Sequence, residues 1–134
     1  QEFSEGCNEF WWTLSYVAKG LKREEIIDAK DMLESIVRPV FWKLIEWKIG
    51  SEHNFRISVG KSGKFARKLI SNSLYENIFK TYSDSNIESN WNALLLIAKI
   101  FNRKQNKLGK VLNFQINATE AKNATNYIQK MKAE

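Results

Sequence analysis

The sequence predicts an all-α fold, an irregular bundle of about five or six helices with one short extended or loop segment near residues 51–64. Apolar residues recur at helical spacing along most of the chain. Three polar residues are each followed three positions later by glutamate, the capping-box pattern of a helix start. The 134 residues contain one proline and fit a single domain.

The first half of the chain is predicted to form two helices. The first covers residues 5–19 with Gly20 as its stop, and the second covers residues 22–49 and ends at Gly50. Pro39 removes one backbone hydrogen bond inside the second helix, so we expect a kink or break near Arg38. The predicted core stripe of the first helix is Phe10, Leu14, Val17 and Leu21. That of the second helix is Ile26, Leu33, Val37, Val40, Phe41 and Leu44.

The second half is predicted to form four further helices after the loop, over residues 65–70, 73–82, 86–107 and 118–132. Capping boxes begin the helices at 73–82, 86–107 and 118–132, and Gly109 is predicted to end the helix at 86–107. The capping pairs are Ser73 with Glu76, Ser85 with Glu88, and Asn117 with Glu120. The buried face of residues 86–107 is predicted to carry Trp91, Leu94, Leu95, Ala98 and Phe101.

Composition excludes several classes of protein. A hydrophobic fraction of 43% is too high for a disordered chain. Cys7 and His53 are single residues of their kinds, so neither an internal disulfide nor a Cys/His metal set is possible. No apolar stretch could span a bilayer, and no signal sequence opens the chain. We therefore expect a cytoplasmic protein.

The net charge of +6 permits an anionic partner such as a nucleotide phosphate or nucleic acid. The charge is uneven, because residues 1–18 carry acids and no Lys or Arg, whereas residues 56–68 are basic. Two patches of opposite sign suggest two ligand groups, although ordinary surface charge is the simpler interpretation. The chain starts with Gln1 close to helical sequence, which suggests a piece of a longer protein.

A second stripe lies on the first predicted helix, away from its core stripe. Glu9, Trp12, Tyr16 and Lys19 are spaced i, i+3, i+7 and i+10 and so share one side of the helix. Aromatic rings beside a carboxylate suit a flat, cationic, hydroxylated ligand. The alternative is that the rings pack on a neighbouring helix while the two charged groups are solvated, and helical spacing alone favours this alternative.

Other basic residues are candidates for binding phosphate. Lys30 lies within the apolar stripe of the second helix, where a lysine either extends to the protein's edge or points into a site. Lys61 and Lys64 lie in a glycine-containing loop before a helix, a weak anion-binding pattern that fails the Walker spacing. No spacing supports a catalytic set or paired aspartates, so we predict no catalytic or metal-binding residue in this chain.

The sequence resembles the streptomycin (aminoglycoside 6-) adenylyltransferase family over about residues 1–101. The most specific match is the run at 7–12, CNEFWW, followed by YVAKGL at 16–21. Other matches follow in the same order. They are AK at 29–30, ML at 32–33, RP at 38–39, EW at 46–47, IG at 49–50, VGKSGK at 59–64 and TYSD at 81–84.

The resemblance implies that this chain is the C-terminal helical, substrate-side domain of an enzyme that transfers AMP from ATP to a streptomycin hydroxyl and so confers antibiotic resistance. Paired aspartates that hold Mg²⁺ would belong to an N-terminal nucleotidyltransferase domain absent from this chain, which we expect to be inactive alone. Glu9, Trp12 and Tyr16 would then bind the aminoglycoside. Lys19, with Lys30, Lys61 and Lys64 as secondary candidates, would meet the phosphates of ATP.

Two alternatives remain at this stage. The first is a basic helical module that binds nucleic acid, against which stands the absence of a helix with one basic face. The second is a protein-interaction module that docks through the tryptophan stripe. The identity of the aminoglycoside, the hydroxyl that is modified and the role of the last thirty or so residues are not fixed by the sequence.

Overall fold

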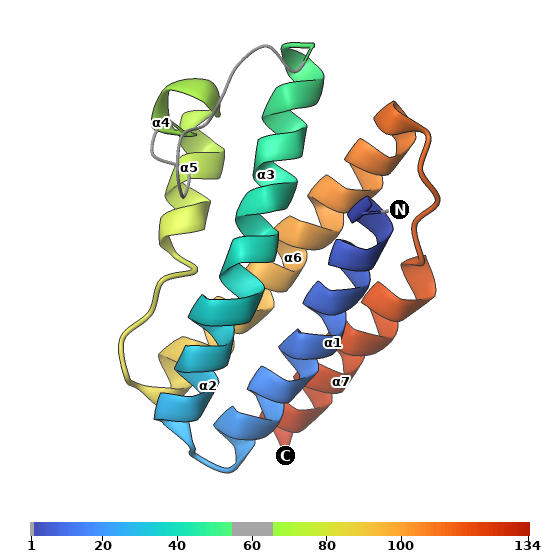
Figure 1. Cartoon of the computed structure of the whole chain (residues 1–134). Coiled ribbons are helices and arrows are strands. Elements are labelled where there is room, and N and C mark those ends of the chain that lie inside the picture. The colour runs from blue at the N-terminus through green and yellow to red at the C-terminus, as the bar shows by residue number, and fades with distance from the viewer. Residues whose placement is uncertain (1, 55–65) are drawn as a thin grey trace.

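Helices form almost all of the structure, which is a computed structural model that describes residues 2–54 and 66–134 (Figure 1). The all-α prediction is confirmed. The elements are α1 (Glu2–Lys22), α2 (Ile26–Met32), the π-helix η1 (Leu33–Val37), α3 (Arg38–Glu52), α4 (Ala66–Leu69), α5 (Asn72–Phe79), α6 (Ile87–Leu112) and α7 (Ala118–Ala133).

Helix α1 is the centre of the bundle. It contacts α2, η1, α3, α6 and α7, and Figure 1 shows it lying between α3 and α7 with α6 behind. The ring of Phe10 stacks on that of Phe101 from α6 with centroids 3.6 Å apart. Trp11 meets both rings edge-on, and its indole N–H donates to Oε1 of the buried Gln105 over 3.1 Å. Leu14, Val17 and Leu21 are also buried, so the predicted core stripe of α1 is confirmed.

Gly20 does not end α1, contrary to the prediction, because the helix continues to Lys22. A Cβ at Gly20 would lie only 3.1 Å from the Cβ of Ala29 on α2. Gly20 therefore allows α1 and α2 to pack closely, and it does not end α1. The chain changes direction between α1 and α2 at Glu24, whose φ of 60° lies in the left-handed region.

The expected disturbance around Pro39 takes the form of a π-turn. The predicted helix 22–49 is divided into α2, η1 and α3, and the amide of Arg38 bonds to the carbonyl of Leu33, five residues back. Proline has no N–H to donate, and its ring crowds the carbonyl four residues earlier. The wider turn before Pro39 relieves this crowding while the helix continues.

Gly109 likewise lies inside a helix instead of ending it. Helix α6 continues to Leu112 and is capped by Asn113 in the left-handed conformation, with φ of 60°. A Cβ on Gly109 would lie 2.6 Å from the Cγ1 of Ile116, so the glycine allows the following loop to fold closely over the helix. The predictions for Gly20 and Gly109 were wrong for the same reason, since a glycine required for close packing has the sequence signature of a helix stop. The stop predicted at Gly50 was also wrong, because α3 continues to Glu52.

Two of the three capping predictions were wrong, because neither Ser73 nor Ser85 is the residue that caps its helix. Ser71 caps α5 and accepts from the amide of Leu74, and Asn86 caps α6 and accepts from the amide of Ser89. Asn117 caps α7 as predicted, accepting from the amide of Glu120 at 3.0 Å. Residues 51 and 52 of the predicted loop belong to α3, while 55–64 lie outside the described residues.

Candidate functional site

The outward face of α1 carries the four residues of the second stripe. Trp12 is 67% exposed and Tyr16 46% exposed, and their ring centroids lie 6.4 Å apart with planes inclined by 29°. The Nζ of Lys19 lies 5.0 Å from the centroid of the Tyr16 ring, within cation–π range. Glu9 is also exposed. The two aromatic rings therefore face outward instead of packing in the core, and we call these four residues the α1 face.

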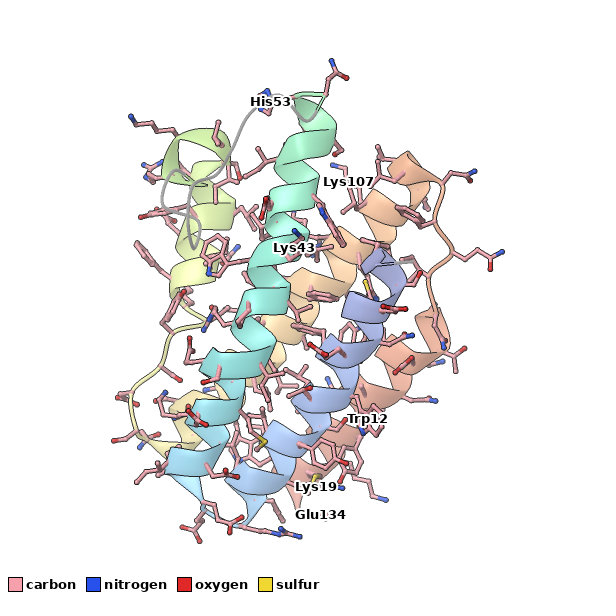
Figure 2. All side chains as sticks on the ribbon, viewed as in Figure 1. Trp12, Lys19, Lys43, His53, Lys107 and Glu134 are labelled. Atoms are coloured by element: carbon pink, nitrogen blue, oxygen red, sulfur yellow. The ribbon has the colours of Figure 1, made fainter. Side chains whose placement is uncertain are left out.

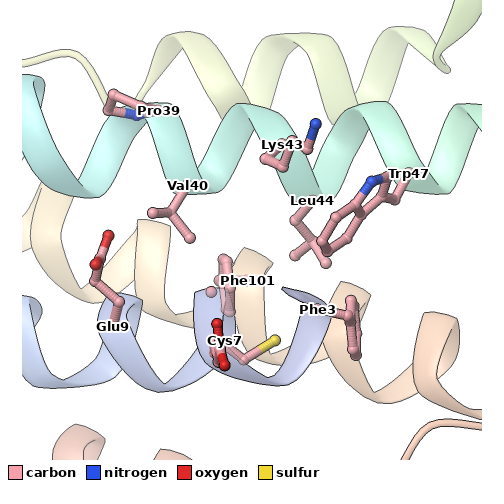
Figure 3. A pocket seen from close by; sticks show the side chains of 11 residues that line it. Phe3, Cys7, Glu9, Pro39, Val40, Lys43, Leu44, Trp47 and Phe101 are labelled. Atoms are coloured by element: carbon pink, nitrogen blue, oxygen red, sulfur yellow. The ribbon is translucent and has the colours of Figure 1, made fainter. Parts of the chain in front are cut away.

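A groove between α1 and α3 borders the α1 face on one side. Its volume is about 390 Å³. Figure 3 shows Phe3 and Glu9 extending from α1 toward Val40 and Trp47 of α3. The lining residues are Phe3, Glu5, Gly6, Cys7, Glu9, Pro39, Val40, Lys43, Leu44, Trp47 and Phe101. The charged lining residues are Glu5, Glu9 and Lys43, so the groove combines a net negative charge with apolar surface.

A second groove, between α1 and α7, borders the other side of the α1 face. Its volume is about 640 Å³, and it contains Trp12 together with side chains of α7. Figure 2 shows Trp12 on the side of α1 that faces α7, with Lys19 further along α1. The lining residues are Trp11, Trp12, Ser15, Asn117, Thr119, Glu120, Asn123, Ala124 and Tyr127. The α1 face thus contributes Glu9 to one groove and Trp12 to the other.

The sequence matches the family described as streptomycin adenylyltransferase over residues 1–131. This chain belongs to the streptomycin adenylyltransferase family. Curated aminoglycoside 6-adenylyltransferases are similar to it, with 39% identity over 107 residues for the one from Bacillus subtilis (strain 168) and 32% over 130 residues for the one from Campylobacter jejuni. The one from Staphylococcus aureus is 33% identical over 129 residues.

The matches cover most of this chain but less than half of each curated relative. They span 80%, 97% and 96% of the chain, and 37%, 45% and 45% of the respective relatives. A solved structure, the crystal structure of an aminoglycoside 6-adenyltransferase from Bacillus subtilis, superposes with a TM-score of 0.89 at 32% identity. That superposition covers 99% of this chain and 50% of the solved chain.

Lys30, one of the predicted phosphate ligands, lies away from both grooves in this family member. Its ammonium donates to the carbonyl oxygens of Ser83 at 2.7 Å and Asp84 at 3.0 Å, and to Oδ1 of Asn90 at 3.1 Å. These bonds attach α2 to the segment between α5 and α6 and to the first turns of α6. Lys61 and Lys64 lie outside the described residues, so their predicted role stays a prediction.

Arg38 makes a similar attachment from the start of α3. Its guanidinium donates to Oγ1 and to the carbonyl of Thr81, pairs with Glu34 at 2.9 Å and lies 3.8 Å from the centroid of the Tyr82 ring. Arg38 and Thr81 are both buried. The Arg-Pro and Thr-Tyr-Ser-Asp matches therefore meet in space as a structural junction.

Cys7 is buried at the base of the α1–α3 groove, and this burial raises the pKa of its thiol to about 12. The thiol stays protonated at neutral pH, which makes it a poor nucleophile. Within residues 2–54 and 66–134, no group of three or more His, Cys, Asp or Glu side chains could hold a metal ion. Among the same residues, no helix has the length and apolar character of a membrane span.

The sequence prediction missed the residues that complete the two grooves. On α3, Lys43 lies 5.6 Å from the centroid of the Trp47 ring and shares the α1–α3 groove with Glu9. On α7, Glu120, Asn123 and Tyr127 share the other groove with Trp12. The four-residue spacing of Lys43 and Trp47 is a signal that could have identified that pair. Nothing local to α7 indicates that it lies beside α1.

Proposed function

We propose that this chain is the aminoglycoside-binding helical part of an adenylyltransferase that transfers AMP from ATP to an aminoglycoside hydroxyl and thereby confers antibiotic resistance. Three aminoglycoside 6-adenylyltransferases among its relatives support the reaction class. A separate nucleotidyltransferase domain, N-terminal to this chain in the full-length protein, would supply the paired aspartates for Mg²⁺. On this proposal the chain is inactive when isolated.

The exposed α1 face is the observation that carries the proposal. A tryptophan that is 67% exposed, next to a half-exposed tyrosine and a carboxylate, offers ring faces and a negative charge to a ligand at one place on the surface. An aminoglycoside presents cationic groups, hydroxyls and flat C–H faces. Glu9 would pair with a guanidinium or ammonium, while Trp12 and Tyr16 would stack on a ring.

Lys19 would serve the nucleotide. It lies at the far end of the α1 face from Glu9, in the last part of α1. A lysine ammonium there is suited to the triphosphate, and its contact with the Tyr16 ring would place the anion next to the sugar-binding surface. Because the described residues of this chain offer no metal set, we assign no step of the transfer to Mg²⁺ held here. What these residues supply is orientation of the two substrates.

The test is calorimetric titration of streptomycin into the full-length protein that contains this chain. Glu9→Gln keeps the side-chain shape and removes the charge, so we expect binding about tenfold weaker through loss of one charge-assisted contact. Glu76→Gln on α5 is the matched control, because Glu76 is exposed and lines neither groove. We expect it to bind as the natural sequence does.

Absence of binding by the unmodified full-length protein would overturn the proposal, as would equal affinity of the Glu9 and Glu76 variants. Salt-sensitive binding of nucleic acid in place of streptomycin would favour a nucleic-acid module. Self-association that Trp12→Ala abolishes, without streptomycin binding, would favour a protein-docking face.

A further inference from the structure

The α1–α7 groove contains polar groups that the fold leaves without partners. Across the described part of the chain, no hydrogen bond reaches the side chains of Thr119, Asn123 or Tyr127, or the indole N–H of Trp12. The other polar members are already engaged, since Ser15 donates to the Trp11 carbonyl and Asn117 caps α7. A cluster of unengaged donors and acceptors beside aromatic rings is available for a ligand.

The chemistry of this lining is that of a sugar site. The aromatic rings it can offer to a ligand are those of Trp12 and Tyr127, because Trp11 is only 2% exposed, and Ala124 is its single aliphatic residue. Aromatic faces cover the C–H faces of a ring, while the Asn123 amide both donates and accepts, as hydroxyl groups require. Glu120 is the one charged residue among those lining the groove, and its sign favours a cationic sugar over an anionic one.

We propose that the α1–α7 groove is a second subsite that holds one ring of the aminoglycoside, with Asn123 and Tyr127 of α7 as its specificity-determining residues. This inference rests on the proposed function and extends it from α1 to α7. Glu120 pairs with an amino group of the ring. Its Oε2 lies 3.5 Å from the Asn117 amide, which holds the carboxylate beside the start of α7.

The position of the groove fits a ligand with more than one ring. Glu9 in the α1–α3 groove and Trp12 in the α1–α7 groove are three residues apart, which is about 4.5 Å along the helix axis. A ligand lying across the α1 face would therefore place a cationic ring at Glu9 and a further ring between Trp12 and Tyr127. The last helix, for which the sequence alone indicated no function, becomes part of the substrate site.

The test is streptomycin titration of the full-length protein with substitutions on α7. We expect Tyr127→Ala and Asn123→Ala each to weaken binding about tenfold, through loss of stacking and of the amide contacts. Asn126→Ala is the matched control, because Asn126 is an exposed asparagine on the same helix that does not line the groove. Circular dichroism of each variant checks that α7 remains folded. If Tyr127→Ala unfolds, Tyr127→Leu replaces it, because leucine keeps an apolar side chain but removes the stacking ring, and the same weakening is expected.

Two failures can be told apart. If streptomycin binds and Glu9→Gln weakens it, but the Asn123 and Tyr127 variants match the Asn126 control, the subsite is refuted while the proposed function stands. If the unmodified full-length protein does not bind streptomycin, both proposals are refuted. If the α7 variants lose affinity while the control does not, the subsite is supported.

Discussion

Lys30→Met tests whether this lysine acts in the fold or at the phosphates. Its ammonium has three protons, and it lies 2.7–3.3 Å from four oxygens of Ser83, Asp84 and Asn90. Three charge-assisted bonds at about 1.5–3 kcal/mol each give an upper limit of about 4.5–9 kcal/mol. Asp84 is exposed and its carbonyl can bond water after the change, so we expect the free energy of unfolding to fall by about 2–4 kcal/mol.

Urea unfolding followed by circular dichroism measures this loss, with the midpoint moving and the slope unchanged. Lys22→Met is the control, since Lys22 is exposed at the end of α1 and should change the stability by less than about 0.5 kcal/mol. A loss below about 1 kcal/mol for Lys30→Met would refute the reasoning. A small loss of stability together with weaker ATP binding would support the prediction from the sequence that Lys30 binds the phosphates of ATP.

Two further predictions concern buried groups. Arg38→Met should lower the free energy of unfolding by about 3 kcal/mol in the same urea assay. The change leaves the buried carbonyl of Thr81 unpaired and removes the contact with the Tyr82 ring. An unchanged unfolding midpoint would contradict this prediction. Cys7 should make stability fall at alkaline pH. Its pKa is higher in the folded state, so its contribution is complete below the unfolded value of 9.0 and is lost as pH rises from there toward about 12. The free energy of unfolding of the natural sequence and of Cys7→Ala, compared from pH 8 to pH 11, gives the contribution of the Cys7 thiol. Parallel pH profiles for the two proteins would contradict this prediction.

The sequence was sufficient for the class of fold and for most of the buried positions, because helical periodicity is a local property. Ile26, Val40 and Leu95, which were also predicted for the buried faces, are only partly buried. Phe10, Leu14, Val17 and Leu21 are all at most 2% exposed, as their spacing predicts. Helix ends were less predictable. Gly20 and Gly109 are required by contacts with Ala29 and Ile116, and such contacts between separate elements leave no local signature.

The candidate site divides in the same way. The α1 face was identifiable from spacing, because its residues lie on one helix and share one side of it. The partners on α3 and α7 come from segments distant in sequence, and their proximity to α1 depends on how the helices cross. Lys30 illustrates the opposite difficulty, since a lysine in an apolar stripe has the same pattern whether it binds a ligand or, as here, carbonyls of a neighbouring segment.

Trp11 and Trp12 show how one helix can separate folding from binding. Trp11 is 2% exposed and bonded to Gln105, whereas Trp12 is 67% exposed and makes no hydrogen bond within the described residues. We expect Trp11→Ala to lower the free energy of unfolding by about 3–5 kcal/mol and Trp12→Ala to change it by less than about 0.5 kcal/mol. Streptomycin affinity of the full-length protein should respond to Trp12→Ala at temperatures where both proteins are folded. Equal stability losses for the two variants would mean that Trp12 supports the fold, and the α1 face would then lose its claim as a ligand surface.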